Sequence, residues 1–197
     1  LLTPVAKAFP TDIGVEVASL GVQVHGGMGY IEETGAAALL RDARIAPIYE
    51  GTNGIQAIDL VTRKLPRADG GVVRGYIAEL RGQAEAARGA NIPDLGETGG
   101  HLLAALDDLE RATNYLLQLL SEERVEEALC GATPYLRLFG FAVGGTMLAR
   151  GALSSGDAGE ARLCRYFAEN HLCETTALRK SVMEGAESLL SASEVLS

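Results

Sequence analysis

Apolar residues recur every three or four positions along most of this chain, and that spacing predicts helices. Between residues 12 and 24 they form one helical face, with Thr11 as a candidate N-cap and Pro10 just outside the helix. The glycine-rich segment 26–30 is predicted to be a turn, because glycine readily adopts the positive φ angles that end helices. Residues 34–44 are rich in alanine and leucine, which indicates either a short helix or a buried connecting segment.

A firmer helical pattern starts after Glu50 and ends before the first of two linkers. Thr52 or Asn53 can cap this helix, because both side chains accept hydrogen bonds from free backbone N–H groups. Stretches 66–75 and 93–100 carry charges, glycine and proline, and are predicted linkers on either side of a helix over 73–90.

Three long helical patterns complete the chain, over residues 102–120, 121–153 and 157–190. Pro134 lies inside the second pattern and marks either a kink or a restart. No alternation typical of strands persists beyond a few residues. The sequence therefore predicts an all-α helical bundle in two regions, residues 1–65 and a second helical region over 66–197.

Charge and composition narrow the class of protein. The 197 residues are 47% hydrophobic and 22% charged, which is typical of globular proteins. A formal net charge of -9 without a basic run would repel a phosphate backbone, so we expect no nucleic-acid partner. No apolar stretch of about 18 residues is present, so we expect no membrane span and a soluble, cytoplasmic protein. The chain does not begin with methionine, which suggests a fragment of a longer protein.

Metal and disulfide chemistry have little support. Cys130, Cys164 and Cys173 are odd in number and widely spaced within helical patterns, so we predict buried free thiols. His25 has no second histidine or carboxylate at metal-ligand spacing, and we predict no metal site. The larger side chains of the second region are predicted to form the bundle core: Phe139, Phe141, Met147, Tyr166 and Phe167.

Glu50 is the candidate for chemistry. An acidic residue near a helix N-terminus commonly does no more than complement the helix dipole. Here, however, the apolar segment 47–49 precedes Glu50, and Gly51 follows it without a side chain that would block a ligand. Apolar surroundings would leave the carboxylate partly dry, which makes it a stronger base.

Three segments carry a family pattern in a fixed order and spacing: GVQVHGGMGY at 21–30, LLRDARI at 39–45 and IYEGT at 48–52. Together they resemble the C-terminal helical domain of the acyl-CoA dehydrogenases, which are FAD-dependent flavoproteins. The resemblance implies that Glu50 is the catalytic base, which removes the α-proton of an acyl-CoA thioester while the β-hydride goes to the flavin. Many relatives carry glutamine in place of Gly54, so one cofactor contact is expected to be missing here.

The resemblance also implies cofactor contacts. In relatives, the residues that match Gln23 and Gly27 contact the ADP part of FAD from a neighbouring subunit, and the residue that matches Thr52 is a further contact. Gly26 belongs to the same turn, where backbone N–H groups can approach a pyrophosphate. The alternative role of these glycines is simply to end the helix.

Tyr49 and Gly51 are expected beside the acyl group, with core packing as the alternative for Tyr49. Residues 66–197 resemble the C-terminal extension of a subgroup of large acyl-CoA dehydrogenases, including 3-methylmercaptopropionyl-CoA dehydrogenases. We therefore expect an enzyme fragment, inactive alone, that belongs to a homo-oligomer using acyl-CoA and an acceptor such as an electron-transfer flavoprotein. The alternative is a non-catalytic helical oligomerisation or interaction module.

Overall fold

The structure is helical throughout its described length. A computed structural model describes the backbone of residues 1–195 and the side chains of residues 1–192. This part contains eleven α-helices and no β-strand, which confirms the predicted all-α class. The helices are Thr3–Val24 (α1), Gly27–Tyr30 (α2), Ala36–Ile45 (α3), Asn53–Asp59 (α4), Gly71–Gly89 (α5), Thr98–Ser121 (α6), Val125–Cys130 (α7), Ala132–Ser155 (α8), Ala158–Asn170 (α9), Glu174–Glu184 (α10) and Ala186–Val195 (α11). Shorter segments are the 3-10 turns Glu32–Thr34 (η1) and Pro93–Leu95 (η3) and the π-helical Leu60–Lys64 (η2).

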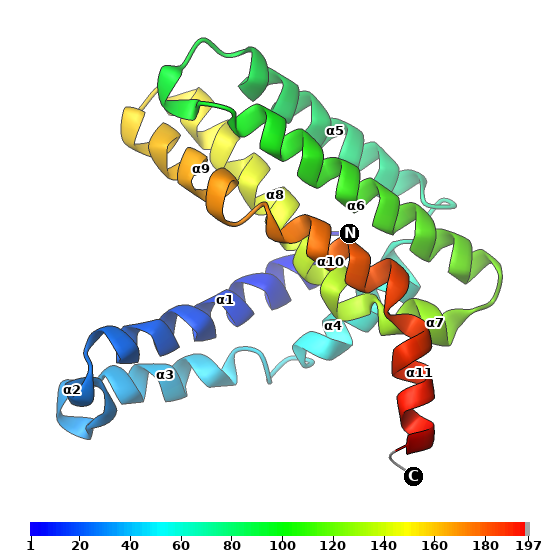
Figure 1. The fold of residues 1–197 in the computed structure, drawn as a ribbon, viewed down its shortest axis with the longest axis horizontal. Helices are drawn as coiled ribbons and strands as arrows, with labels where there is room; N and C mark the ends of the chain where they lie inside the picture. The colour runs from blue at the N-terminus through cyan, green and yellow to red at the C-terminus, as the bar shows by residue number, and fades with distance from the viewer. Residues whose placement is uncertain (196–197) are drawn as a thin grey trace.

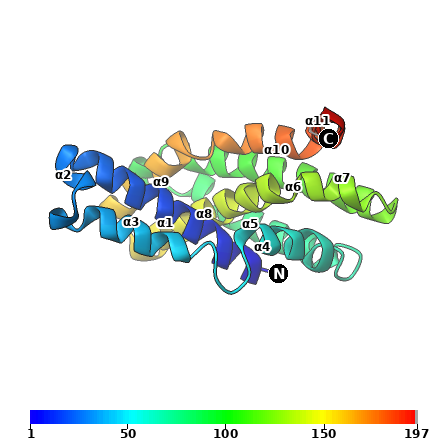
Figure 2. The same ribbon diagram turned by 90° about the horizontal axis from the view of Figure 1, so that it is seen from below.

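The helices form a bundle and a projecting arm. The bundle consists of α5, α6, α8, α9 and α10, which run side by side (Figure 1). α1 and α3 form an antiparallel hairpin that extends away from the bundle, with α2 at its tip (Figure 1). The view from below shows the same pairing of α1 with α3 (Figure 2). We call residues 3–45 the arm; α4 connects it to the bundle.

α8 is the central helix of the protein. It contacts α1, α4, α5, α6, α9 and α10, and Arg137 and Arg150 are the only charged residues among its 24. A helix that is apolar on all sides has to be covered on all sides. Its glycines let the neighbouring helices approach closely: a Cβ on Gly145 would lie 3.0 Å from a side-chain carbon of Leu102.

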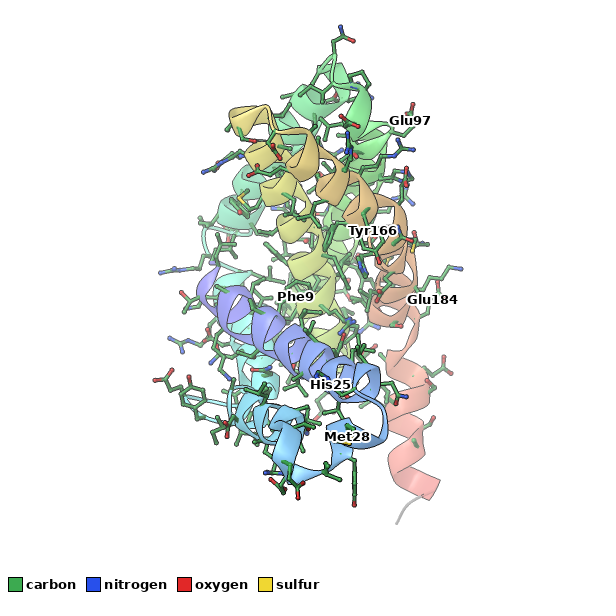
Figure 3. All side chains as sticks on the ribbon, turned by 90° about the vertical axis from the view of Figure 1, so that its left-hand side faces the viewer. Phe9, His25, Met28, Glu97, Tyr166 and Glu184 are labelled. Atoms are coloured by element: carbon green, nitrogen blue, oxygen red, sulfur yellow. The ribbon has the colours of Figure 1, made fainter. Side chains whose placement is uncertain are left out.

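Phe9 packs the arm against α8 (Figure 3). A Cβ added to Gly140 would overlap the Phe9 ring, so the close approach of the two helices requires glycine at this position. The Phe9 ring also meets Phe141 edge to face, with 5.1 Å between ring centroids. Arg137 adds an ion pair from α8 to Glu16 on the arm, with 2.7 Å between Nη1 and Oε1.

The start of α1 differs from the prediction. The helix begins at Thr3, so Pro10 lies inside it and Thr11 is not its N-cap. An interior proline costs about 3 kcal/mol of helix stability. Packing compensates for this cost, because Ala8 and its apolar neighbours are buried in the core. The Thr11 hydroxyl donates to the Lys7 carbonyl within the same helix, at 2.9 Å.

The first linker and the segments around it have shifted bounds. Most of the segment 34–44 is helical, as α3 over Ala36–Ile45, which settles the alternative left open by the sequence in favour of a short helix. The helix predicted over 73–90 is confirmed as α5, but it begins at Gly71, inside the predicted linker. The second predicted linker is likewise shorter, because α6 begins at Thr98.

The last two helical patterns are divided. The pattern over 121–153 restarts at Gly131 rather than bending, and Pro134 lies in the first turn of α8. The single helix expected over 157–190 is wrong: turns at residues 171–173 and at Gly185 separate α9, α10 and α11. The first of these turns contains neither glycine nor proline, so the sequence gives no sign of the break.

A buried ion pair joins α6 to α10. Asp108 Oδ1 lies 2.7 Å from Arg179 Nε, and the two side chains are only 12% and 17% exposed. The hydroxyls of Thr175 and Thr176 donate to the other carboxylate oxygen, at 3.0 and 2.8 Å. All three partners come from the first two turns of α10, so one carboxylate fixes both the position and the rotation of that helix.

Two residues predicted to be buried lie at the surface. Tyr166 is 58% exposed, because the buried face of α9 is formed by smaller residues such as Ala161 and Cys164 (Figure 3). Cys173 is exposed at the turn before α10, whereas Cys164 is buried as predicted and Cys130 is half-buried. The other predicted core residues are buried or partly buried: Phe139, Phe141, Met147 and Phe167.

The cysteines are therefore expected to differ in reactivity. Burial raises the pKa of the Cys164 thiol to about 11, so at pH 8 almost none of it is the reactive thiolate. In the folded chain, we expect an alkylating reagent to modify the exposed Cys173 first and Cys164 only on unfolding. Mass spectrometry of the labelled peptides over time measures both rates. Equal rates at the two cysteines in the folded chain would contradict the structure.

Two further predictions concern the chain as a whole. None of the described helices is long and apolar enough to cross a membrane. The division of the chain at residue 65 stays a prediction, because buried residues on both sides of it, such as Leu60 and Leu80, belong to one core.

Candidate active site

Glu50 lies in the turn between α3 and α4, at the base of the arm (Figure 1). The backbone is left-handed at both Glu50 and Gly51, with φ angles of 55° and 82°. This conformation is easy for glycine but costs about 1–2 kcal/mol for other residues. Strain of this kind persists only where the surroundings hold the backbone, and it is concentrated at functional sites. Within the turn, the Tyr49 amide donates to the Ile45 carbonyl at 3.1 Å.

Thr52 fixes the start of α4. Its hydroxyl accepts a hydrogen bond from the Ile55 amide at 3.3 Å, so Thr52 rather than Asn53 is the N-cap. One turn later, the side-chain amide of Gln56 donates back to the Glu50 carbonyl at 3.3 Å. The first turn of α4 therefore holds the backbone that carries Glu50.

Asn53 has a structural role that the sequence does not indicate. Its amide nitrogen donates to Asp12 Oδ1 at 2.7 Å and to the Ala8 carbonyl at 3.1 Å, and its Oδ1 accepts from Lys7 Nζ at 2.8 Å. Its backbone amide also donates to the Pro47 carbonyl at 3.0 Å. The side-chain partners are more than 40 residues away in the sequence, so no local spacing points to them.

The Glu50 carboxylate is exposed and bonds to no described side chain. Large apolar side chains near it in the sequence are exposed as well: Ile48 by 52%, Tyr49 by 51% and Ile55 by 55%. The apolar neighbours expected from the sequence are thus present, but this chain alone does not enclose the carboxylate in a dry pocket. Exposed apolar side chains around a polar group are typical of a surface that a ligand or another protein segment covers.

Gln23, Gly26 and Gly27 lie at the tip of the arm, where α1 ends, and all three are exposed. Gly26 has φ 60° and ψ -141°, a conformation that glycine alone adopts readily. A Cβ on Gly26 or Gly27 would meet no atom within 4 Å, so the backbone is open to an approaching group. The side chains of His25 and Met28 mark the same tip (Figure 3).

Gly29 has a structural role in the same segment. It is buried, and a Cβ at this position would overlap the Val22 carbonyl of α1. The Thr34 hydroxyl donates to the Met28 carbonyl at 2.6 Å and closes the tip from the other side. The third glycine of the GGMGY segment therefore makes the sharp reversal at the tip possible.

The two groups of candidate residues lie at opposite ends of the arm (Figure 1). α3 separates them, and its ten residues span about 15 Å. The structure therefore brings Glu50 and Thr52 together but not with Gln23, Gly26 or Gly27 of the same chain. No three of the described His, Cys, Asp and Glu side chains gather closely enough to hold a metal ion.

Two protein families match this chain, one on each side of residue 65. Residues 1–65 match the family described as "Acyl-CoA dehydrogenase, C-terminal domain", and residues 76–193 match "Acetyl-CoA dehydrogenase C-terminal like". The helical fold is thus that of the C-terminal part of such an enzyme, and the chain belongs to the acyl-CoA dehydrogenase family.

Individual relatives make the similarity more specific. The 3-methylmercaptopropionyl-CoA dehydrogenase of Ruegeria pomeroyi is 40% identical over 212 aligned positions, which cover 98% of this chain and 34% of that protein. Acyl-CoA dehydrogenase family member 11 of Caenorhabditis elegans is 43% identical over 61 residues, which cover 31% of this chain and 10% of that protein. An acyl-CoA dehydrogenase of Bacillus subtilis is 47% identical over 53 residues, covering 27% of this chain and 14% of that protein. The chain thus spans about a third or less of the length of these relatives.

Proposed function

We propose that this chain supplies the C-terminal part of an FAD-dependent acyl-CoA dehydrogenase and that Glu50 is its catalytic base. The observation that carries the proposal is the Glu50 turn, in which a carboxylate without a described bonding partner lies in a restrained backbone beside exposed apolar side chains. A general base needs a carboxylate that is free to accept a proton and held in a defined position. An acidic residue that only complements a helix dipole needs neither a held left-handed backbone nor apolar neighbours.

In this role, Glu50 removes the proton from the carbon next to the thioester carbonyl of acyl-CoA. Bound FAD supplies the acceptor for the hydride that leaves the β-carbon. Ile48, Tyr49 and Ile55 exclude water once ligand and the rest of the protein cover them, and a carboxylate in such an apolar site holds a proton more firmly. Gly51 leaves space for the ligand beside the carboxylate, and Tyr49 borders the acyl group.

Gln23, Gly26 and Gly27 would hold the ADP part of FAD, with Thr52 as a contact near the base. The glutamine amide offers both a donor and an acceptor, and the open glycine backbone allows a pyrophosphate to approach its N–H groups. Because tip and base of the arm are far apart, the tip residues would contact the FAD of a neighbouring subunit. The proposal therefore includes a homo-oligomer.

The outer face of α1 supports an assembly in which the arm is covered. Val17, Leu20 and Val24 recur at helical spacing and are 59%, 63% and 85% exposed. A stripe of this kind normally packs against another element. Acyl-CoA is the proposed substrate class, with 3-methylmercaptopropionyl-CoA as one candidate, and an electron-transfer flavoprotein is the proposed acceptor.

The test is a titration of the purified full-length protein with a series of acyl-CoA thioesters in the absence of oxygen. We expect bound flavin, and loss of the oxidised-flavin absorbance on addition of at least one thioester. Full-length protein that binds no flavin, or whose flavin no acyl-CoA reduces, would overturn the proposal. That outcome would favour the alternative of a non-catalytic helical interaction module.

The chain by itself is proposed to be inactive. Glu50 and its apolar neighbours are open to solvent here, and the tip and base of one arm cannot contact the same FAD. The same titration with residues 1–197 alone should therefore give neither retained flavin nor reduction. Turnover by the isolated chain would contradict the division of the site between different parts of the protein.

A further inference from the structure

Lys7 reaches from α1 to the turn that carries Glu50. Its ammonium Nζ donates to the Gly51 carbonyl at 2.9 Å and to Asn53 Oδ1 at 2.8 Å, across 44 and 46 residues of sequence. The lysine is half-buried: its bond to Asn53 is partly shielded from water, whereas its bond to the Gly51 carbonyl is exposed. No ion pair to a carboxylate competes for the Lys7 ammonium among the described residues.

The bonded carbonyl belongs to the most restrained part of the turn. Glu50 and Gly51 are both left-handed, and the orientation of the Gly51 carbonyl depends on both residues keeping this conformation. Two donors oppose a change of this conformation at successive carbonyls: Gln56 holds the Glu50 carbonyl, and Lys7 holds the Gly51 carbonyl. Because the Glu50 side chain has no described partner of its own, the backbone is what fixes the direction of its Cα–Cβ bond, from which the carboxylate extends.

Asn53 makes the contact with Lys7 a rigid one. The asparagine donates to Asp12 and to the Ala8 carbonyl, both on α1, while it accepts from Lys7. Lys7 therefore belongs to the same helix, α1, that anchors the start of α4 through Asn53. Phe9 packs α1 against α8, so the helix that carries Lys7 is itself fixed to the bundle.

We propose that Lys7 is a positioning residue for Glu50: its bond to the Gly51 carbonyl holds the left-handed turn and thereby the point and direction from which the Glu50 side chain leaves the backbone. This inference rests on the proposed function of Glu50 as the base. Lys7 does not touch the substrate; it acts through the backbone. Loss of its bond should slow proton removal without weakening the binding of acyl-CoA, because misplacement of a reacting group by about 1 Å can cost about a hundredfold in rate.

The test uses the full-length protein and measures the rate of flavin reduction at saturating acyl-CoA, together with the dissociation constant of acyl-CoA. For Lys7→Met, which keeps the aliphatic stem but lacks donors, we expect the rate to fall by between about tenfold and a hundredfold, with the dissociation constant changed less than about twofold. Lys7→Arg retains N–H donors and should recover most of the rate. Lys64→Met is the matched control: it removes a half-buried lysine that pairs with Asp59 at 3.4 Å, outside the turn, and should retain the wild-type rate.

Glu50→Gln separates the two proposals. If Glu50→Gln keeps the wild-type rate, the proposed base is wrong, whatever Lys7 does. If Glu50→Gln is inactive but Lys7→Met matches Lys64→Met in rate, the role of Glu50 as the base is supported and the positioning role of Lys7 is overturned. In the double variant Lys7→Met/Glu50→Gln, we expect no further loss beyond that of Glu50→Gln, because a positioning residue has nothing left to position.

A second measurement covers the case in which Lys7→Met does not fold. Lys7→Gln then replaces it, and amide hydrogen exchange of the segment 46–52 is compared with that of wild type and of Lys64→Met. Faster exchange confined to this segment supports the restraint by Lys7. Unchanged exchange in the folded variant overturns it.

Discussion

Replacing Glu50 with glutamine in the full-length protein is expected to slow reduction of the flavin by acyl-CoA by roughly 10²–10⁴-fold. The amide has nearly the shape of the carboxylate but cannot accept the α-proton. Binding of acyl-CoA should change little, because the size of the side chain is kept. Rapid-mixing measurement of flavin reduction at saturating acyl-CoA gives the rate directly, and its dependence on acyl-CoA concentration gives the affinity.

The structure also predicts that the fold tolerates this substitution. The Glu50 carboxylate bonds to no described side chain, so Glu50→Gln removes no native contact and should leave the melting temperature unchanged. Glu33→Gln is a suitable control, because Glu33 is another exposed carboxylate of the arm without a described partner. Near-normal flavin reduction in Glu50→Gln, or an equal loss in Glu33→Gln, would exclude Glu50 as the base.

Replacing Asp108 with alanine should produce the largest loss of stability, about 3–5 kcal/mol of the free energy of unfolding. The substitution leaves the Arg179 guanidinium without its partner in a site where that side chain is only 17% exposed. It also removes the acceptor for the Thr175 and Thr176 hydroxyls. Because these contacts join the first two turns of α10 to α6, we expect α10 to separate from α6 before the other helices unfold. Urea unfolding followed by circular dichroism measures the loss.

Two variants calibrate this prediction. Glu85→Ala breaks a surface ion pair with Arg88, whose side chains are 48% and 60% exposed, and should cost less than about 1 kcal/mol. Asp108→Asn keeps one acceptor oxygen and should fall between the two. A loss for Asp108→Ala no greater than that for Glu85→Ala would show that the buried pair does not hold α10 in place.

Much of the fold can be read from local pattern. The start of α4 at Thr52 or Asn53 and the helical patterns of α5 and α6 follow from side-chain chemistry within a few residues, and the structure confirms them with Thr52 as the cap. The start of α1 cannot be read from local pattern, because burial of the helix against α8 decides whether a proline at position 10 is tolerated. The break at residues 171–173 is equally invisible, since the contact of α10 with Asp108 on a distant helix fixes where that helix starts.

The candidate site divides in the same way. The motif around Glu50 and the glycines at 26–27 are continuous in the sequence, so their chemistry and family pattern could be recognised there; their roles remain predictions. Lys7 and Asn53 gave no such signal. Each is an ordinary polar residue until folding places it against a partner more than 40 residues away.

The sequence by itself determined that this protein is helical, that it belongs with the acyl-CoA dehydrogenases, and that one carboxylate lies between an apolar segment and a glycine. These properties depend on side-chain periodicity and on short runs of neighbouring residues. Only the tertiary structure decided that the Glu50 turn is left-handed and held from α1 by Lys7 and Asn53. It also showed that the glycine segment 26–30, predicted as a turn, is mostly the short helix α2 and lies at the opposite end of the arm. The physical reason is that hydrogen bonds and packing between distant segments form only when the helices meet, and they then outweigh local preference.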